Sequence, residues 1–127
     1  MSKAVSAAQS SRAVGQQSES LAVSHLSQLG YHIIARNVYS PYGEIDVIAW
    51  HDDVLCFIEI RSRASSMHGD PLETIGATKQ RRIIRSAWYF LENSMQHWPE
   101  SMRFDVVGVY LDETPPRFAV LQGAFVA

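Results

Sequence analysis

The sequence has a single cysteine, no long hydrophobic run and almost no excess charge. Cys56 has no second cysteine with which to form an internal disulfide or a CxxC zinc site, so both features are excluded. The longest uncharged apolar runs, such as "VIAW" and "FAVL", fall far short of the roughly 20 residues that cross a bilayer. The N-terminus also lacks the apolar segment of a signal peptide. These absences predict a soluble, cytoplasmic protein that does not bind membranes.

Metal-binding and phosphate-binding signatures with a fixed local spacing are missing too. The five histidines are scattered without metal-ligand spacing, and no glycine-rich phosphate loop is present. The net charge of -2 provides no overall attraction to nucleic acid, so any basic binding surface must be local. Cys56 lies in the apolar stretch "VLCFI", which is typical of a small buried side chain rather than a nucleophile.

The residues that are present suffice for one folded domain. A chain of 127 residues that is 46% hydrophobic and 10% aromatic can build one core. Residues 1–11 are small and polar and predict a flexible tail, which leaves residues 12–127 for a single domain. Apolar spacing predicts helices at residues 12–29 and 74–93, with three strands between them and two strands after the second helix. This order predicts an α/β fold.

Charged residues interrupt the apolar hairpin "YGEIDVIAWHDDVLCFIEIRSR", residues 42–63. A turn centred on Asp52 and Asp53 places Asp46 opposite Glu59 on the neighbouring strand. Their Cβ atoms would lie about 4.5–5.5 Å apart, a separation at which like charges destabilise a strand pair. The pair therefore needs a compensating positive charge.

Two sources of that positive charge are open, and they imply different functions. In the first, Arg61 bridges Glu44, Asp46 and Glu59 in a structural ion network. In the second, Asp46 and Glu59 hold a divalent cation with a backbone carbonyl and waters, because Mg²⁺ prefers all-oxygen sites that retain water. Arg61 then lies on the same strand face as Glu59, where its charge can stabilise a phosphate. The second arrangement suits hydrolysis of phosphodiester bonds.

The stretches "GEIDVIA" and "FIEIRSR" resemble the PD-(D/E)xK nuclease motif, which has an aspartate on one strand and Glu-x-Lys on the next. With "GQQSESLAVSHLSQLGYHIIARN" upstream, and "KQRRI" and "RFDVVGV" downstream, the sequence resembles the YraN family, which is similar to archaeal Holliday junction resolvases. The resemblance covers roughly residues 15–110. It implies a restriction-endonuclease-like α/β fold, with a mixed central sheet flanked by helices. It also implies metal-dependent hydrolysis of DNA at branched or otherwise structured sites.

The resemblance implies roles for individual residues as well. Asp46 matches the aspartate of the motif and Glu59 its acidic residue, so both would bind Mg²⁺ or Mn²⁺. Arg61 stands where lysine is usual, and because arginine stays protonated it can clamp a phosphate but cannot transfer a proton. Glu19 matches the first-helix glutamate that resolvase-like members direct toward the metal; the alternative is an ordinary surface glutamate. Resolvases need two active sites for two strands, which by analogy implies a homodimer.

Basic residues gather on one side of the second predicted helix. Lys79, Arg81, Arg82 and Arg85 are four of the 11 lysines and arginines, and no acidic residue occurs between Lys79 and Leu91. A solvated helix face is one explanation, and contact with nucleic-acid phosphates, which would depend on salt, is the other. We expect Lys79, Arg82 and Arg85 to hold the DNA backbone.

Aromatic residues offer no comparable signal for nucleic-acid binding. They form no obvious stacking platform for single strands, and Trp50 and Trp88 are expected in the core. His68 and Asp70, in the loop before the second helix, could approach the site but are assigned no role.

The favoured function is that of a metal-dependent DNA nuclease, and two others stay open. A nucleic-acid-binding module of nuclease fold would bind DNA without cleaving it. A scaffold with a structural ion network would bind neither metal nor DNA.

Overall fold

The structure is a computed structural model that describes residues 7–64 and 75–127. Its elements follow in the predicted order of helix, three strands, helix and two strands. They are α1 (Ala7–Gln28), β1 (Tyr31–Ser40), β2 (Gly43–His51), β3 (Val54–Arg63), α2 (Ala77–Ser94), β4 (Ser101–Tyr110) and β5 (Arg117–Phe125).

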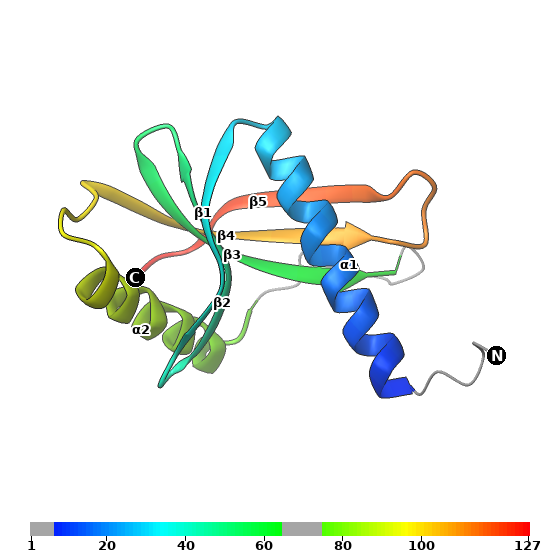
Figure 1. Ribbon diagram of the computed structural model, residues 1–127, viewed down its shortest axis with the longest axis horizontal. Helices are drawn as coiled ribbons and strands as arrows, with labels where there is room; N and C mark the ends of the chain where they lie inside the picture. Colours follow the sequence, from blue (N-terminus) through cyan, green and yellow to red (C-terminus); the bar gives the residue numbers. More distant parts are fainter. Residues whose placement is uncertain (1–6, 65–74) are drawn as a thin grey trace.

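The five strands form one mixed sheet in the order β1-β2-β3-β4-β5 (Figure 1). All neighbouring strands are antiparallel except β3 and β4, which are parallel and are connected through α2. A mixed five-stranded sheet with two helices is an α/β fold, as predicted, and is consistent with a restriction-endonuclease-like fold.

Both helices differ from their predicted bounds at their first residues. α1 begins at Ala7, so residues 7–11, which the sequence assigned to a flexible tail, belong to the helix. Those residues carry no apolar spacing, but alanine is the best helix former and can extend a helix beyond its buried face. α2 begins at Ala77 instead of near residue 74, which lies outside the described residues.

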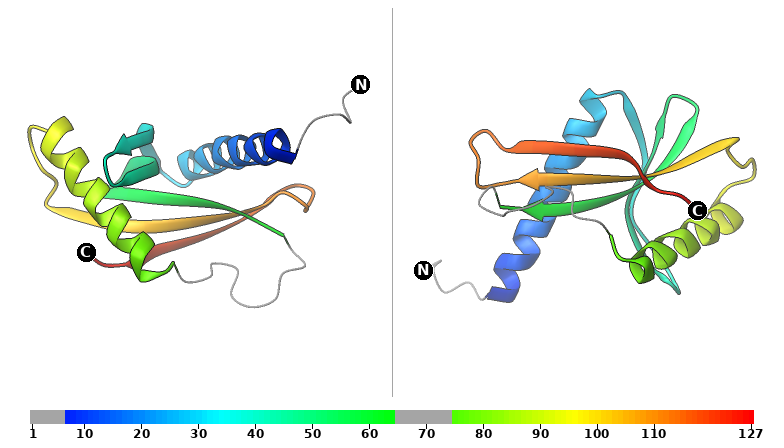
Figure 2. Two further views of the ribbon diagram at one scale, coloured as in Figure 1. Left: turned by 90° about the horizontal axis from the view of Figure 1, so that it is seen from below. Right: turned by 180° about the vertical axis from the view of Figure 1, so that it is seen from behind.

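Alternating residues of β2 and β3 supply two hydrophobic clusters on opposite faces of the sheet. Figures 1 and 2 show that α1 crosses one end of the twisted sheet and that α2 lies at the other end, beside the β1–β2 turn. The cluster under α1 includes Ala22, Leu26, Val47, Ala49, Cys56 and Ile58. The cluster under α2 includes Ile48, Leu55, Phe57, Ile83, Ala87 and Leu91. Cys56 is fully buried, in agreement with the sequence, and burial raises the pKa of its thiol to about 12.

A buried hydrogen-bonded ion pair holds three strands together at Asp105 of β4, whose exposed fraction is 1%. Arg103 donates to both carboxylate oxygens, at 2.8 and 2.9 Å. Tyr31 of β1 and the backbone N–H of Gly123 of β5 donate at 3.0 Å each, and Gln122 donates to the Tyr31 hydroxyl at 3.1 Å. Burial, together with the charge of Asp105, raises the pKa of Tyr31 to about 12. The Asp105 carboxylate is therefore fully neutralised and hydrogen-bonded inside the fold.

Candidate active site

Asp46 and Glu59 lie together on β2 and β3, away from the hairpin turn. Their carboxyl groups lie close enough for each to affect the ionisation of the other, and Asp46 Oδ2 accepts the N–H of Ile60 at 2.8 Å. β2 and β3 pair as predicted from His51–Val54 to Val47–Ile58, but the described register does not continue to Asp46 and Glu59. The Asp46 side chain takes the Ile60 N–H where regular pairing was predicted, and this brings the two carboxyl groups into contact.

The chain also departs from regular alternation next to Asp46. Ile45 lies two positions before Val47, so regular alternation would place both on one face of the sheet. Ile45 packs instead in the cluster under α2 with Ile48. Gly43 precedes this segment with φ of +150°, a conformation that favours glycine. The irregular start of β2 is therefore what sets the direction of the Asp46 side chain.

Burial raises the pKa of Asp46 from its ordinary value of 3.8 to about 7. The negative charges of Glu59 and Glu44 raise the pKa further, while the hydrogen bond from Ile60 N–H lowers it. No lysine or arginine in the described part of the chain forms an ion pair with Asp46. Near neutral pH Asp46 is therefore partly protonated, and a cation could take the place of that proton.

The oxygen atoms of Asp46 and Glu59 fit a Mg²⁺ or Mn²⁺ ion that keeps several waters. Within residues 12–64 and 75–127, no group of three histidine, cysteine, aspartate or glutamate side chains could hold a metal. Mg²⁺ is commonly held by one or two carboxylates, with waters and substrate phosphates completing its shell. His68 and Asp70, which the sequence left without a role, lie outside the described residues.

Lys79, in the first turn of α2, forms an ion pair with Glu59. The sequence predicted that Lys79 contacts the DNA backbone, and it left open an ion network in which Arg61 bridges the acidic residues. In the structure the cation that pairs with Glu59 is Lys79. The Lys79 side chain is 54% exposed and that of Glu59 is 11% exposed, so the ammonium group lies at the surface while the carboxylate that it neutralises is largely buried. The structure thus adds a cation from α2 to the carboxyl pair. Lys79 is far from Glu59 in the sequence, and no motif predicted their contact.

Arg61 lies on β3 two positions beyond Glu59 and is partly buried. Its neighbour in the parallel ladder is Gly108 of β4. The proposed contact between Arg61 and a phosphate stays a prediction.

Glu19 of α1 faces β1 and accepts three hydrogen bonds at Oε1. Arg36 donates at 3.0 and 3.1 Å, and Asn37 donates at 2.8 Å. Asn37 has a positive φ of 52° and lies on the strand next to Asp46. Glu19 is therefore placed to fix the backbone beside Asp46, and its predicted action on a metal stays a prediction.

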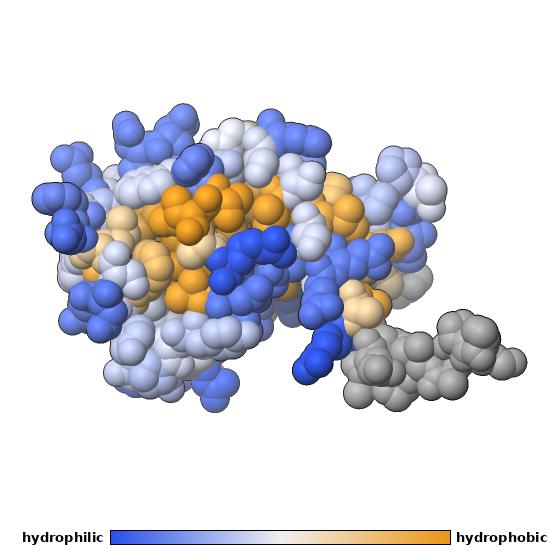
Figure 3. Space-filling model, in the orientation of Figure 1, coloured by the Kyte–Doolittle hydropathy of each residue, from blue (hydrophilic) through white to orange (hydrophobic). Residues whose placement is uncertain are grey.

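The basic side of α2 forms one wall of a shallow pocket of about 290 Å³. In Figure 3 the most hydrophobic side chains lie over the middle of the face shown, whereas the surface over α2, at the lower left, is pale to blue. The predicted contacts Arg82 and Arg85 line this pocket together with Arg81, which the sequence placed on the same basic side of the helix, whereas Tyr42 and Thr78 were not predicted. Its lining residues are Tyr42, Thr78, Arg81, Arg82 and Arg85.

The β1–β2 turn closes the other side of this pocket. Ser40 Oγ is 2.8 Å from Ser86 Oγ of α2, and it also accepts the N–H of Tyr42 at 3.1 Å. These contacts hold Tyr42 over the helix, beside Arg85. The only local signal for this arrangement was the turn sequence "SPYG", which does not indicate what the turn packs against.

Trp88 corrects the sequence-based view of the aromatic residues. It was expected in the core but is exposed on α2, because its position lies at the margin of the helix face that contacts the sheet. Trp50 is partly buried and packs at the edge of the cluster under α2.

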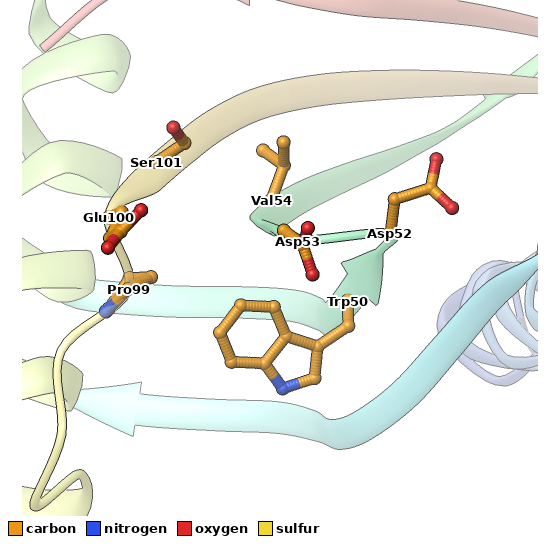
Figure 4. A pocket seen from close by; sticks show the side chains of 7 residues that line it. All are labelled: Trp50, Asp52, Asp53, Val54, Pro99, Glu100 and Ser101. Carbon is orange, nitrogen blue, oxygen red and sulfur yellow. The ribbon is translucent and has the colours of Figure 1, made fainter.

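A second pocket, of about 480 Å³, lies at the opposite end of the β2–β3 hairpin (Figure 4). Its acidic residues Asp52, Asp53 and Glu100 are exposed and come from the hairpin turn and from the segment before β4. They lie apart from the Asp46–Glu59 pair and offer control positions for it.

Neither described helix combines the length and apolar character that spanning a bilayer requires. The predicted cytoplasmic location and the predicted homodimer stay predictions.

Relatives of this chain share most of its length. The model described as "Uncharacterised protein family UPF0102" matches residues 18–109. A UPF0102 protein of Anaeromyxobacter sp. (strain Fw109-5) is 40% identical over 116 residues, which cover 90% of this chain and 85% of that protein. A UPF0102 protein of Rhodococcus opacus (strain B4) is 40% identical over 114 residues, covering 89% and 96% of the two chains. The matched region contains Asp46, Glu59 and Lys79. The chain therefore belongs to the UPF0102 family, the YraN family that its motifs resemble.

Proposed function

We propose that the protein is a metal-dependent nuclease that hydrolyses phosphodiester bonds in DNA. The observation that best supports this function is the Asp46–Glu59 pair, which holds two carboxyl groups in contact, one of them with a pKa of about 7. Two adjacent acids destabilise a fold unless a cation or a proton compensates them, and such pairs concentrate at functional sites. The resemblance of "GEID" and "FIEIR" to the PD-(D/E)xK motif supports the same function.

Asp46 and Glu59 would hold the metal ion, and Glu19 would keep β1 in place beside Asp46 through Arg36 and Asn37. Such an ion supplies an activated water and neutralises charge on the phosphate. Lys79 would move from Glu59 to a phosphate oxygen and, with Arg61, stabilise the negative charge that develops there.

Arg82 and Arg85 would bind the phosphates next to the cleaved bond. Both line the pocket beside α2, and the charge of this pocket complements a polyanion. The contacts are electrostatic, so DNA affinity should fall as the salt concentration rises.

A cleavage assay tests the proposal. Branched, duplex and single-stranded DNA are incubated with Mg²⁺ or Mn²⁺ and the wild-type protein, Asp46→Asn or Glu59→Gln. We expect each substitution to lower the rate at least about 100-fold, the scale of losing an essential electrostatic contact. Asp53→Asn and Glu100→Gln are matched controls, since they remove exposed carboxylates from the other end of the hairpin. Equal cleavage by all five proteins would show that another site or a contaminant is responsible.

A nucleic-acid-binding module without turnover is the second candidate. Arg61 at the usual lysine position favours it, because arginine cannot transfer a proton. DNA binding in the absence of any cleavage that depends on Asp46 would support this function.

A further inference from the structure

Two neighbouring pockets lie along the outer side of α2. The first is the arginine-lined pocket beside the candidate active site. The second, of about 190 Å³, is lined by Tyr42, Arg85, Trp88, Tyr89 and Glu92. Tyr42 and Arg85 line both pockets, so the two pockets lie next to each other, and we refer to them together as the groove. We call its second half, Tyr42, Arg85, Trp88 and Tyr89, the aromatic–arginine pocket.

The aromatic side chains of this pocket are held in place yet remain open to solvent. Tyr42, Trp88 and Tyr89 are between 37% and 44% exposed. Tyr42 and Tyr89 contact each other edge-on, with ring centroids 6.5 Å apart, and the Arg85 guanidinium lies 5.7 Å from the Tyr42 ring centroid. Such a concentration of exposed rings is uncommon on a surface that binds nothing.

Trp98 extends the aromatic surface beyond the pocket. It is 50% exposed, and its ring centroid lies 5.6 Å from that of Trp88. Its Nε1–H donates to the backbone oxygen of Leu91 at 3.1 Å, which fixes the ring against the end of α2. The rings are thus positioned before any ligand binds, which lowers the entropy cost of binding.

The charge and shape of the groove select the ligand. Arg81, Arg82 and Arg85 favour a polyanion, and flat exposed rings favour planar groups. In a duplex the faces of the bases are covered by their neighbours, so only unpaired bases can stack on protein rings. Glu92, the acid that lines the far end, can accept hydrogen bonds from base amino groups.

We infer that the aromatic–arginine pocket binds unpaired bases of a single-stranded DNA segment whose phosphates lie along the arginines. Lys79 and Trp88 lie roughly 14 Å apart along the helix axis, at about 1.5 Å per residue. That length corresponds to about four stacked nucleotides at about 3.4 Å each. The binding itself does not depend on the proposed nuclease activity. The substrate class that follows from it, DNA with a single-stranded segment next to the cleaved bond, rests on that proposed function.

Binding is tested in EDTA, so that no cleavage occurs. The ligands are a single-stranded oligodeoxyadenylate of about 12 nucleotides, an abasic strand of equal length and a duplex. Binding is followed by fluorescence anisotropy of labelled DNA, and circular dichroism checks that each variant is folded. Tyr39→Leu is the matched control, because Tyr39 is a 71% exposed tyrosine on β1 outside the groove.

We expect Trp88→Leu and Tyr42→Leu each to weaken binding of the single strand at least about fivefold, the lower end of what a stacked base contributes. Binding of the abasic strand and of the duplex should change less than twofold, and Tyr39→Leu should bind like wild type. Equal weakening for all three ligands, or equal affinity of wild type for the normal and abasic strands, would overturn the inference. Failure of the wild type to bind any of the three would also overturn it and would leave the pocket to a protein partner.

A second readout separates this inference from the proposed function. Asp46→Asn should lose cleavage while keeping its affinity for the single strand. Trp88→Leu should keep cleavage of a duplex while losing its preference for a substrate with a flap of about four or more unpaired nucleotides. Absence of all cleavage with intact single-strand binding would reject the nuclease and retain the pocket.

Discussion

Asp46 and Asp105 are aspartates in neighbouring parts of one sheet, and their surroundings differ in kind. Asp105 accepts hydrogen bonds from Arg103, Tyr31 and the backbone of Gly123, so every oxygen has donors and the charge has a partner. Asp46 accepts one backbone N–H and otherwise contacts another acid. The first arrangement needs nothing more for stability, whereas in the second Lys79 pairs with Glu59 and Asp46 keeps its raised pKa.

The number of hydrogen-bond donors and cations around each carboxylate distinguishes the structural role expected for Asp105 from the binding role proposed for Asp46. A buried charge is tolerated when it is paired and hydrogen-bonded, as at Asp105. An acid whose charge is opposed by burial and by a second acid shifts its pKa upward, as at Asp46, and gains most from a ligand that brings positive charge. Asp105 should therefore matter for folding and Asp46 for binding.

The largest expected effect is the loss of stability on removing Asp105. Asp105→Ala leaves Arg103 without its partner, which should lower the free energy of unfolding by about 3–5 kcal/mol. Asp46→Ala should leave stability unchanged or raise it at pH 8. Urea denaturation of both variants measures the contrast, and similar losses for the two would remove the distinction drawn between them.

Metal binding should make Asp46 contribute to the stability of the fold. Mn²⁺ at about 100 times its dissociation constant should stabilise the wild type by about 2.7 kcal/mol, because it binds only the folded state. Asp46→Asn should abolish this gain, which thermal unfolding with and without Mn²⁺ would detect. Glu100→Gln is the matched control and should keep the full gain, and a stabilisation that survives Asp46→Asn would place the metal elsewhere.

The pH dependence of stability should show the Asp46 proton directly. Its pKa is about 7 in the folded state and has the ordinary value of about 3.8 when unfolded, so between these values the folded state binds the additional proton. Metal-free protein should therefore lose stability as pH rises from 4 to 7, by at most about 1.4 kcal/mol per pH unit, and level off above pH 7. The measurement is the difference in unfolding free energy between wild type and Asp46→Asn across this range. A difference that stays constant with pH would mean that Asp46 is not protonated in the folded protein.

The smallest expected effect concerns the cation at the candidate active site. Lys79→Ala breaks an ion pair between a mostly exposed lysine and a largely buried glutamate, so stability should fall by about 1–2 kcal/mol, which is less than for a fully buried pair. Arg103→Ala, which leaves Asp105 buried without its cation, should cost several times more. Chemical denaturation measures the free energy of unfolding of both variants. A large loss of stability for Lys79→Ala would identify Lys79 as a structural residue.

Features set by local spacing could be predicted from the sequence. The period of the apolar residues indicated both helices, and the strand alternation, with the turn at Asp52 and Asp53, gave the register from His51 to Val47. The acidic pair was found because both residues interrupt apolar strands. These signals act over a few residues and therefore survive in a single sequence.

Features set by tertiary packing could not be predicted. The Lys79–Glu59 ion pair and the position of Tyr42 over α2 depend on where a helix and a turn meet. Helical periodicity gave a core-facing arc but not how much of it the sheet covers, which is why Trp88 was misplaced. Asp105 was unremarked because its donors come from β1, β4 and β5.

The hydrogen bond between Gln122 and Tyr31 joins β5 to β1, the first and last strands in the sheet order. Outer strands carry unpaired backbone groups that can recruit strands of other molecules and start aggregation. Because Gln122 and Tyr31 meet, the curl of the sheet brings its two outer strands toward each other at this point. The hydrogen-bond network around Asp105 thus connects the two outer strands of the sheet. A protein with this network intact should resist amyloid-like self-association better than a variant without it.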